Sequence, residues 1–335
     1  MTDKGKKILK LFIRIIVTSV LLIWVFSNIE RQQLIEALKT ARWSFLIAVW
    51  ALVAMIYWIN SIKMRLILKK QDCNLNTIII FGVSAVTALY SMVMPGMLSM
   101  GMKWYFLRRG TGKGIHVFSS MVYNQLSNIV IMMIFGLGVL ILTNPASIIW
   151  ANSEVSHFLP AICTILLVIV VLFCLLLLNK QTGGKIVEAI GVLLSPFPSG
   201  IRKKAQEILQ QIALFQFVGW QFHLIMFLIT IGGTSLGGVI MYFFAAKAAN
   251  VTVPLSTFAW LWAVIFILQR VPISIANLGI REAILSSVLP IYGVETSAAV
   301  LMSVILFSAL VFMAVIGAIV HYGGFITGVS SDEAV

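Results

Sequence analysis

Long uncharged apolar runs dominate this chain, with short polar segments between them. Each run is at least as long as the roughly 20 residues that a helix needs to cross the hydrocarbon core of a bilayer. The pattern therefore predicts an all-α integral membrane protein that crosses the bilayer several times. The uncharged runs are 77–102, 117–153, 155–179, 208–246, 248–269 and 296–331.

Composition supports the same class. Of the 335 residues, 60% are hydrophobic and only 10% are charged, and the mean hydropathy of +1.03 is far above that of a soluble domain. The net charge of +13 would indicate nucleic acid in a soluble protein. Here the Lys and Arg residues form short clusters between apolar runs, as membrane orientation requires. We expect no nucleic-acid partner.

The positions of the basic clusters predict the topology. Basic residues are enriched in cytoplasmic loops, so we expect a multi-pass protein of the cell inner (plasma) membrane with both termini cytoplasmic. The clusters lie before the first span, after the second (Lys63, Arg65, Lys69, Lys70), at 103–113 and at 202–204. The six predicted full spans are about 11–27, 43–62, 116–142, 158–178, 219–245 and 298–322.

Two apolar segments do not fit full spans. The segment at about 77–107 has basic residues at both ends, and Pro95 and Gly96 interrupt it, so we expect a re-entrant helical hairpin. A second hairpin, at about 254–291, is interrupted at Pro272 and Gly279. Hairpins that enter from opposite faces, one in each half of the chain, are typical of an inverted repeat with a midplane binding site.

The whole chain, 1–335, is then one polytopic membrane domain. Between two spans, the segment at about 185–218 has apolar residues on one helical face and charged residues on the other. We interpret it as a cytoplasmic interfacial helix, with a regulatory partner site as the alternative. The glycine-rich stretch 232–238 favours close helix packing over a hinge.

The stretch RVPISIANLGIREAILSSVLPIYGV, 270–294, carries charge inside the apolar region. Asn277 is suited to cap a helix over 278–289, which places Gly279 and Arg281 in its first turn. A helix N-terminus with an added guanidinium is suited to a phosphate or carboxylate. Side chains one position apart on a helix do not face each other, so we expect Arg281 and Glu282 each to need another partner.

These charged residues have a simpler alternative interpretation. Arg270 and Arg281 could extend to the membrane interface, and Glu282 could only complement the helix dipole. Against it, an ionisable group at the bilayer centre costs at least roughly 2.5 kcal/mol and usually has a function.

A polar group also lies within the uncharged run 117–153. Asn124 and Asn128 share one helical face, and Gln125 is their neighbour. They fit hydrogen bonds between helices or, as the alternative, a polar translocation groove.

The motifs resemble the flippase-like family that includes the membrane domain of lysylphosphatidylglycerol synthases. PISIANLGIREA followed by YGV is similar to its C-terminal signature, and MPGMLSMGMKWYFLRRGTGKG to its first-half segment. The matching positions are Pro272, Gly279, Arg281, Glu282 and Gly293 in the second half, and Pro95, Gly101, Lys103, Arg108 and Arg109 in the first.

The resemblance also has departures. The acidic residue that follows the first-half glycine in the family is Met102 here, and the next helix has Asn124, Gln125 and Asn128 where the family has charged residues. These departures argue against a proton relay through first-half carboxylates.

The resemblance implies a membrane domain with two re-entrant segments that moves a lipid with an anionic headgroup between leaflets. We expect this lipid, a phospholipid or a lipid-linked glycan on a polyprenyl phosphate, to bind at Arg281, Glu282, Asn277, Gly279, Arg270, Lys103, Asn124 and Asn128. The printed chain does not continue into the soluble aminoacyl-transfer domain of the synthases, so we expect no enzyme activity.

Other functions stay open at this stage. A membrane glycosyl- or acyltransferase would need paired carboxylates or a catalytic His near one membrane face, and a non-transporting scaffold for envelope glycolipid assembly is a third alternative. The four His and three Cys residues show no metal-ligand spacing, so we expect no metal and no cofactor. The oligomeric state is open, with a homo-oligomer as one alternative.

Overall fold

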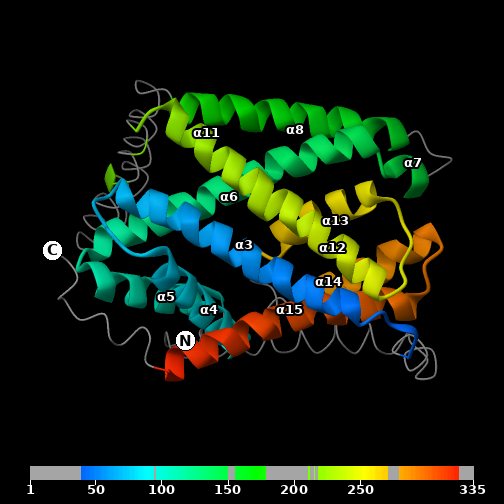
Figure 1. Ribbon diagram of the computed structural model, residues 1–335. Helices are drawn as coiled ribbons and strands as arrows, with labels where there is room; N and C mark the ends of the chain where they lie inside the picture. The colour runs from blue at the N-terminus through cyan, green and yellow to red at the C-terminus, as the bar shows by residue number, and fades with distance from the viewer. Residues whose placement is uncertain are drawn as a thin grey trace, which may run out of the picture.

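The computed structural model describes residues 39–93, 96–149, 155–178, 210–211, 215, 218–270 and 279–323. The helices are α3 (Ser44–Lys69), α4 (Thr77–Val93), α5 (Gly96–Thr111), α6 (Gly114–Thr143), α7 (Ala146–Ile149), α8 (Val155–Leu178), α11 (Trp220–Ile229), the π-helix η2 (Thr230–Leu236), α12 (Gly237–Ala248), α13 (Leu255–Leu268), α14 (Ile280–Val288), the 3-10 helix η4 (Leu289–Tyr292) and α15 (Thr296–Tyr322). The helices form one elongated bundle in which α3 and α12 run in opposite directions and α6 crosses them at an angle (Figure 1).

The predicted full spans agree with the helices in the described part of the chain. Five stretches there are long and apolar enough to cross a membrane, and they correspond to the second to sixth predicted spans. The first predicted span, 11–27, lies outside the described residues, as does most of the predicted interfacial helix at 185–218. The chain is therefore a multi-pass, all-α membrane protein.

One boundary was wrong. The second span was expected to end at residue 62, with Lys63 in a cytoplasmic basic cluster. Helix α3 instead continues to Lys69, and Lys63 is fully buried inside the bundle. A long lysine side chain can stay in the interior when neighbouring helices supply hydrogen-bond acceptors, and residue type alone does not reveal them.

Both broken segments form pairs of short helices. The first pair, α4 and α5, has 17 and 16 residues, and the second pair, α13 and α14, has 14 and 9, all below the roughly 20 needed to cross the core. Figure 1 shows that the pairs enter from opposite ends of the bundle, because α3 and α12, which precede them, run in opposite directions. The interruptions at Pro95 and Pro272 lie outside the described residues.

The best-packed part of the bundle is formed by α15 with α4, α3, α12 and α14. In the apolar window of α15, 56% of the residues are buried inside the protein, against 6% in the window of α8. Helix α8 packs mainly on α6 and leaves its apolar side chains outward, as a lipid-facing helix does. One helix of each short pair, α4 and α14, therefore packs on α15, while α13 packs mainly on α6.

Several glycines allow helices to approach closely. A Cβ added at Gly317 would meet the Ala85 carbonyl oxygen at 2.1 Å, and one at Gly238 would meet the Trp262 indole at 2.1 Å. In the stretch 232–238, Gly233 likewise lies against Ile59. Small residues at helix contacts are how membrane bundles gain packing energy, so the prediction of close packing at this stretch is confirmed.

Substituting Gly317 with Ala should destabilise the bundle, because the obstacle is backbone and cannot rotate away. Overpacking of this kind typically costs roughly 1–3 kcal/mol. Gly138→Ala is the matched control, since no atom lies within 4 Å of its added Cβ. Thermal unfolding in detergent, followed by tryptophan fluorescence, should show a lower midpoint for Gly317→Ala only, and equal midpoints would contradict the packing described.

Cysteine labelling tests the expected orientation. Glu295→Cys, at an exposed helix start, should react with an impermeant maleimide added to intact cells, whereas Lys70→Cys should react only after permeabilisation. Native Cys73 gives little background because it is buried and burial raises the pKa of its thiol. Labelling of Lys70→Cys in intact cells would reverse the orientation.

Candidate functional site

The start of α14 lies where the second hairpin turns back inside the bundle. Gly279 is the N-cap, with a positive φ of 92° that a residue with a side chain rarely adopts, and the helix begins at Ile280. The expected cap at Asn277 and start at residue 278 are therefore wrong, and Asn277 itself lies outside the described residues. Glycine is favoured as the N-cap at this position because the backbone has to enter the helix from a left-handed conformation.

Glu282 caps this helix start from inside the helix. Its Oε2 accepts a hydrogen bond of 2.8 Å from the backbone N–H of Gly279, three residues earlier. The side chain is buried, with a relative exposure of 6% for the residue. An unpaired N–H costs several kcal/mol in a membrane interior, so this bond stabilises the break between the two helices.

The other carboxylate oxygen of Glu282 belongs to a closed network with Arg281 and Ser303. Oε1 accepts from Arg281 Nη2 at 2.5 Å and from the Ser303 hydroxyl at 2.9 Å. The Ser303 oxygen accepts in turn from Arg281 Nε at 2.9 Å. Ser303 comes from α15, so the network links the hairpin to the most buried span.

The ion pair corrects the expectation that Arg281 and Glu282 would each need a different partner. Adjacent side chains leave a helix in different directions, but in the first turn the long guanidinium can bend back to the carboxylate. Burial favours this, because separated charges would each remain unpaired in an apolar region. The pair is nearly neutral as a unit.

Arg281 is also surrounded by aromatic residues. Its guanidinium carbon lies 6.0 Å from the centre of the Phe307 ring, and the buried Tyr242 of α12 is within electrostatic range of both Arg281 and Glu282. Within the described residues, Arg281 Nη1 has no hydrogen-bond acceptor.

A second group of cations takes one residue from each hairpin segment, Lys103 and Arg270. Arg270 follows α13, is exposed, and lies 4.4 Å above the centre of the Phe266 ring. Its charge interacts with that of Lys103 on α5 and with the Tyr57 hydroxyl on α3. Lys103 is therefore near Arg270, and no contact joins it to Arg281 in the described part of the chain. Two like charges held close attract an anion.

The polar residues of α6 differ in whether they have a hydrogen-bond partner. Asn128 is buried, and its Oδ1 accepts a hydrogen bond of 2.6 Å from Lys63 of α3. Asn124, one turn earlier, has a buried Oδ1 without a partner among the described residues. Sequence reasoning missed Lys63 as a site residue. Its spacing of three from Asn60, on one polar face of an apolar helix, is a signal that could have found it.

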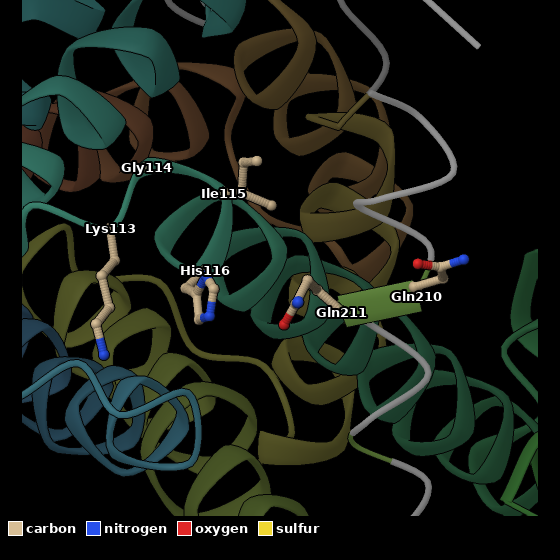
Figure 2. A pocket seen from close by; sticks show the side chains of 6 residues that line it. All are labelled: Lys113, Gly114, Ile115, His116, Gln210 and Gln211. Atoms are coloured by element: carbon tan, nitrogen blue, oxygen red, sulfur yellow. The ribbon is translucent and has the colours of Figure 1, made fainter. Parts of the chain in front are cut away.

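A small surface pocket opens at the end of the bundle where α6 begins. It is lined by Lys113, Gly114, Ile115, His116, Gln210 and Gln211, and Figure 2 shows the His116 and Gln211 side chains near one another. Lys113 donates a hydrogen bond of 3.0 Å to the Asp72 carbonyl. The pocket is open, and none of Lys103, Arg270 and Arg281 lines it, so it does not belong to the candidate site.

The described residues contain no cluster of three or more His, Cys, Asp or Glu that could hold a metal ion. The hairpins carry an ion pair at the start of α14 and, at a separate place, two further cations beside the Tyr57 hydroxyl of α3. This set can bind and orient an anion. Within the described helices Glu282 is the single carboxylate, so they offer no second one for paired acid and base chemistry.

Fold and site together define a polytopic α-helical membrane protein with two charged re-entrant hairpins. The chain belongs to the family described as the lysylphosphatidylglycerol synthase TM region, whose match covers residues 11–318. The expected family is confirmed, and the match includes both hairpins. No curated protein and no solved structure gave a significant match to the chain.

The importance of the buried ion pair can be measured by a double-mutant cycle. Glu282→Gln should lower the free energy of unfolding by an amount on the order of 3 kcal/mol, because Arg281 then stays buried without a counter-ion. Adding Arg281→Met removes that unpaired charge and should recover part of the loss. Thermal unfolding in detergent measures both, and a double variant less stable than Glu282→Gln would contradict a coupled pair.

Proposed function

We propose that this protein is a lipid translocase that moves a lipid with an anionic headgroup between the leaflets of the membrane. The lipid is a phospholipid or a lipid-linked glycan on a polyprenyl phosphate. Membership of the family is consistent with this function, since the family is the membrane region of proteins that are named for a phospholipid product. The chain would act without a cofactor, through binding and conformational change.

One observation carries the proposal. Lys103 of the first hairpin and Arg270 of the second are close enough for their charges to interact. None of the helices that carry or flank them, α3, α5 and α13, contains an Asp or Glu. An anionic headgroup would supply the missing negative charge, and the guanidinium could bind a phosphate by two hydrogen bonds.

The hairpins suit movement as well as binding. Broken helices within the bilayer are tolerated where they are covered by protein or line a wet cavity. Each helix pair enters from a different end of the bundle (Figure 1), so a headgroup bound by Lys103 and Arg270 would be reached from either side when one pair moves. The Arg281 and Glu282 pair anchors the second hairpin to α15, and Arg281 Nη1 offers a further donor.

The orientation proposed for this function has both termini in the cytoplasm of a cell with the protein in its inner membrane. In that orientation Lys103 and the basic end of α5 come from the cytoplasmic hairpin, and Arg270 comes from the outer one. The proposed headgroup site therefore combines one cation from each side.

Reconstituted vesicles test the proposal. Purified protein in phosphatidylcholine vesicles should speed the exchange of a fluorescent phosphatidylglycerol between leaflets, measured by dithionite quenching of the outer leaflet. Arg270→Gln and Lys103→Gln should each slow it about tenfold or more, since a hydrogen bond to a charged group contributes roughly 1.5–3 kcal/mol. Arg270→Lys keeps the charge and should be intermediate.

The control is Arg109→Gln, which removes an exposed cation from the same helix as Lys103 and should leave the rate unchanged. Exchange by wild-type protein no faster than in empty vesicles would contradict a translocase. Normal exchange by both cation variants would contradict this headgroup site while leaving the function in place.

A further inference from the structure

Lys63 is a buried cation that the proposed headgroup site does not use. It lies on α3, two turns from the helix end, and has a relative exposure of 0%. Within the described helices no carboxylate pairs with it, since the single ion pair there joins Arg281 and Glu282. An isolated charge is costly in such a place, and buried ionisable groups in membranes usually mark a function.

The groups that contact Lys63 are acceptors. Its Nζ donates to Asn128 Oδ1 at 2.6 Å and to Ser127 Oγ at 3.0 Å. The Ser127 hydroxyl donates to the Asn124 carbonyl at 3.0 Å, so its oxygen is left to receive the lysine. Neutral acceptors of this kind stabilise a protonated amine, and they account for two of its three N–H groups, so the contacts fit a group that binds a proton.

None of the described helices that pack against α3 offers Lys63 a permanent negative charge. Helices α4, α6, α11, η2, α12 and α15 contain no Asp or Glu. A buried amine without a counter-ion responds to any change in its surroundings by a change in protonation. The titratable groups of the packed helices are Tyr90, His116, Tyr123, His223, Tyr242, Lys247, His321 and Tyr322, and α3 itself adds Tyr57, Arg65 and Lys69.

The nearest of these groups along α6 is already paired. Tyr123 lies one turn before Ser127, and its hydroxyl hydrogen bonds with His223 Nδ1 at 2.9 Å. His223 Nε2 hydrogen bonds with the Phe215 carbonyl at 3.0 Å. Both ring nitrogens of His223 thus have hydrogen-bond partners of their own, and neither of them is Lys63.

A π-helix beside Lys63 shows where the surroundings could change. Segment η2, Thr230–Leu236, packs on both α3 and α6. Its Thr234 hydroxyl donates to Asn60 Oδ1 at 3.3 Å, one turn from Lys63, while its carbonyl accepts from the Trp262 indole at 3.1 Å. Such π-helical segments recur at functional sites because their backbone bonds rearrange locally.

We propose that Lys63 Nζ binds and releases one proton in each transport cycle, and thereby couples lipid movement to the proton gradient. This inference rests on the proposed translocase function. The amine takes a proton from hydronium on one side, which releases water, and returns it to water on the other side. One N–H bond forms and later breaks, and no oxidant or other reactant is needed.

The coupling has a measurable consequence. If one proton moves with one monoanionic headgroup, the step carries no net charge and is unaffected by membrane potential. A difference of one pH unit then corresponds to an approximately tenfold difference in labelled lipid between leaflets at steady state. Because proton and lipid move together, the lipid accumulates in the leaflet that faces the alkaline side.

The experiment uses full-length protein in phosphatidylcholine vesicles that contain fluorescent phosphatidylglycerol. A pH difference is imposed in either direction, and a potential is set separately with valinomycin and potassium. Dithionite quenching then reports the fraction of labelled lipid in each leaflet. Wild-type protein should give the roughly tenfold ratio per pH unit, which reverses with the gradient and is unchanged by the potential.

Three variants separate the role of the lysine from its packing. Lys63→Met removes the proton site and keeps an unbranched side chain, while Asn128→Asp keeps the lysine and gives it a carboxylate that holds it charged. Both should lose the response to the pH gradient. Lys69→Met, an exposed lysine of the same helix, should respond as wild type does. Elution from a size-exclusion column as one symmetric peak shows that each variant is folded.

The outcomes are distinct. A gradient response in wild type and Lys69→Met that is absent from both site variants supports the proposal. If exchange by wild type ends with equal amounts of labelled lipid in both leaflets at every gradient, the coupling is overturned and the translocase function stands. A full gradient response in Lys63→Met has the same meaning. Absence of exchange by wild type overturns the translocase and the coupling with it.

Discussion

The carboxylate of Glu282 is the interaction on which the second hairpin depends. A helix that begins inside a membrane bundle exposes backbone N–H groups that water cannot reach. One oxygen of Glu282 accepts from the Gly279 N–H, and the other binds Arg281 and Ser303. A single side chain thus caps the helix, balances a cation and connects to α15. Without it, three donors at the break would lose their acceptor.

Close packing around α15 makes this arrangement rigid. Gly317 lets α15 lie directly against the backbone of α4, so the first hairpin is pressed on the same helix that binds the second through Ser303. In a membrane, packing and hydrogen bonds stabilise helix association, because lipid already solvates the apolar surface. Both hairpins therefore contact the same span, so a displacement of α15 would move both of them.

Charge is distributed among three places with different chemistry. Arg281 and Glu282 neutralise each other, whereas Lys103 and Arg270 repel each other, and Lys63 is held by neutral acceptors. A closed pair stabilises structure, and an uncompensated cation favours a ligand or a change of protonation. This difference is why the proposed headgroup site is placed at Lys103 and Arg270, and the proposed proton site at Lys63.

The sequence by itself determined the membrane class, the spans of the described part and the two pairs of short helices, because these follow from run length, charge position and helix-breaking residues. Tertiary structure decided the partners of the charges. Asn277 looked like the cap, but the left-handed φ at Gly279 placed the helix start there. Lys63 looked like a surface cation because its acceptors, Ser127 and Asn128, are more than 60 residues away. Hydrophobic periodicity indicates which face of a helix is buried. Only the packing of the helices shows which residues that face contacts.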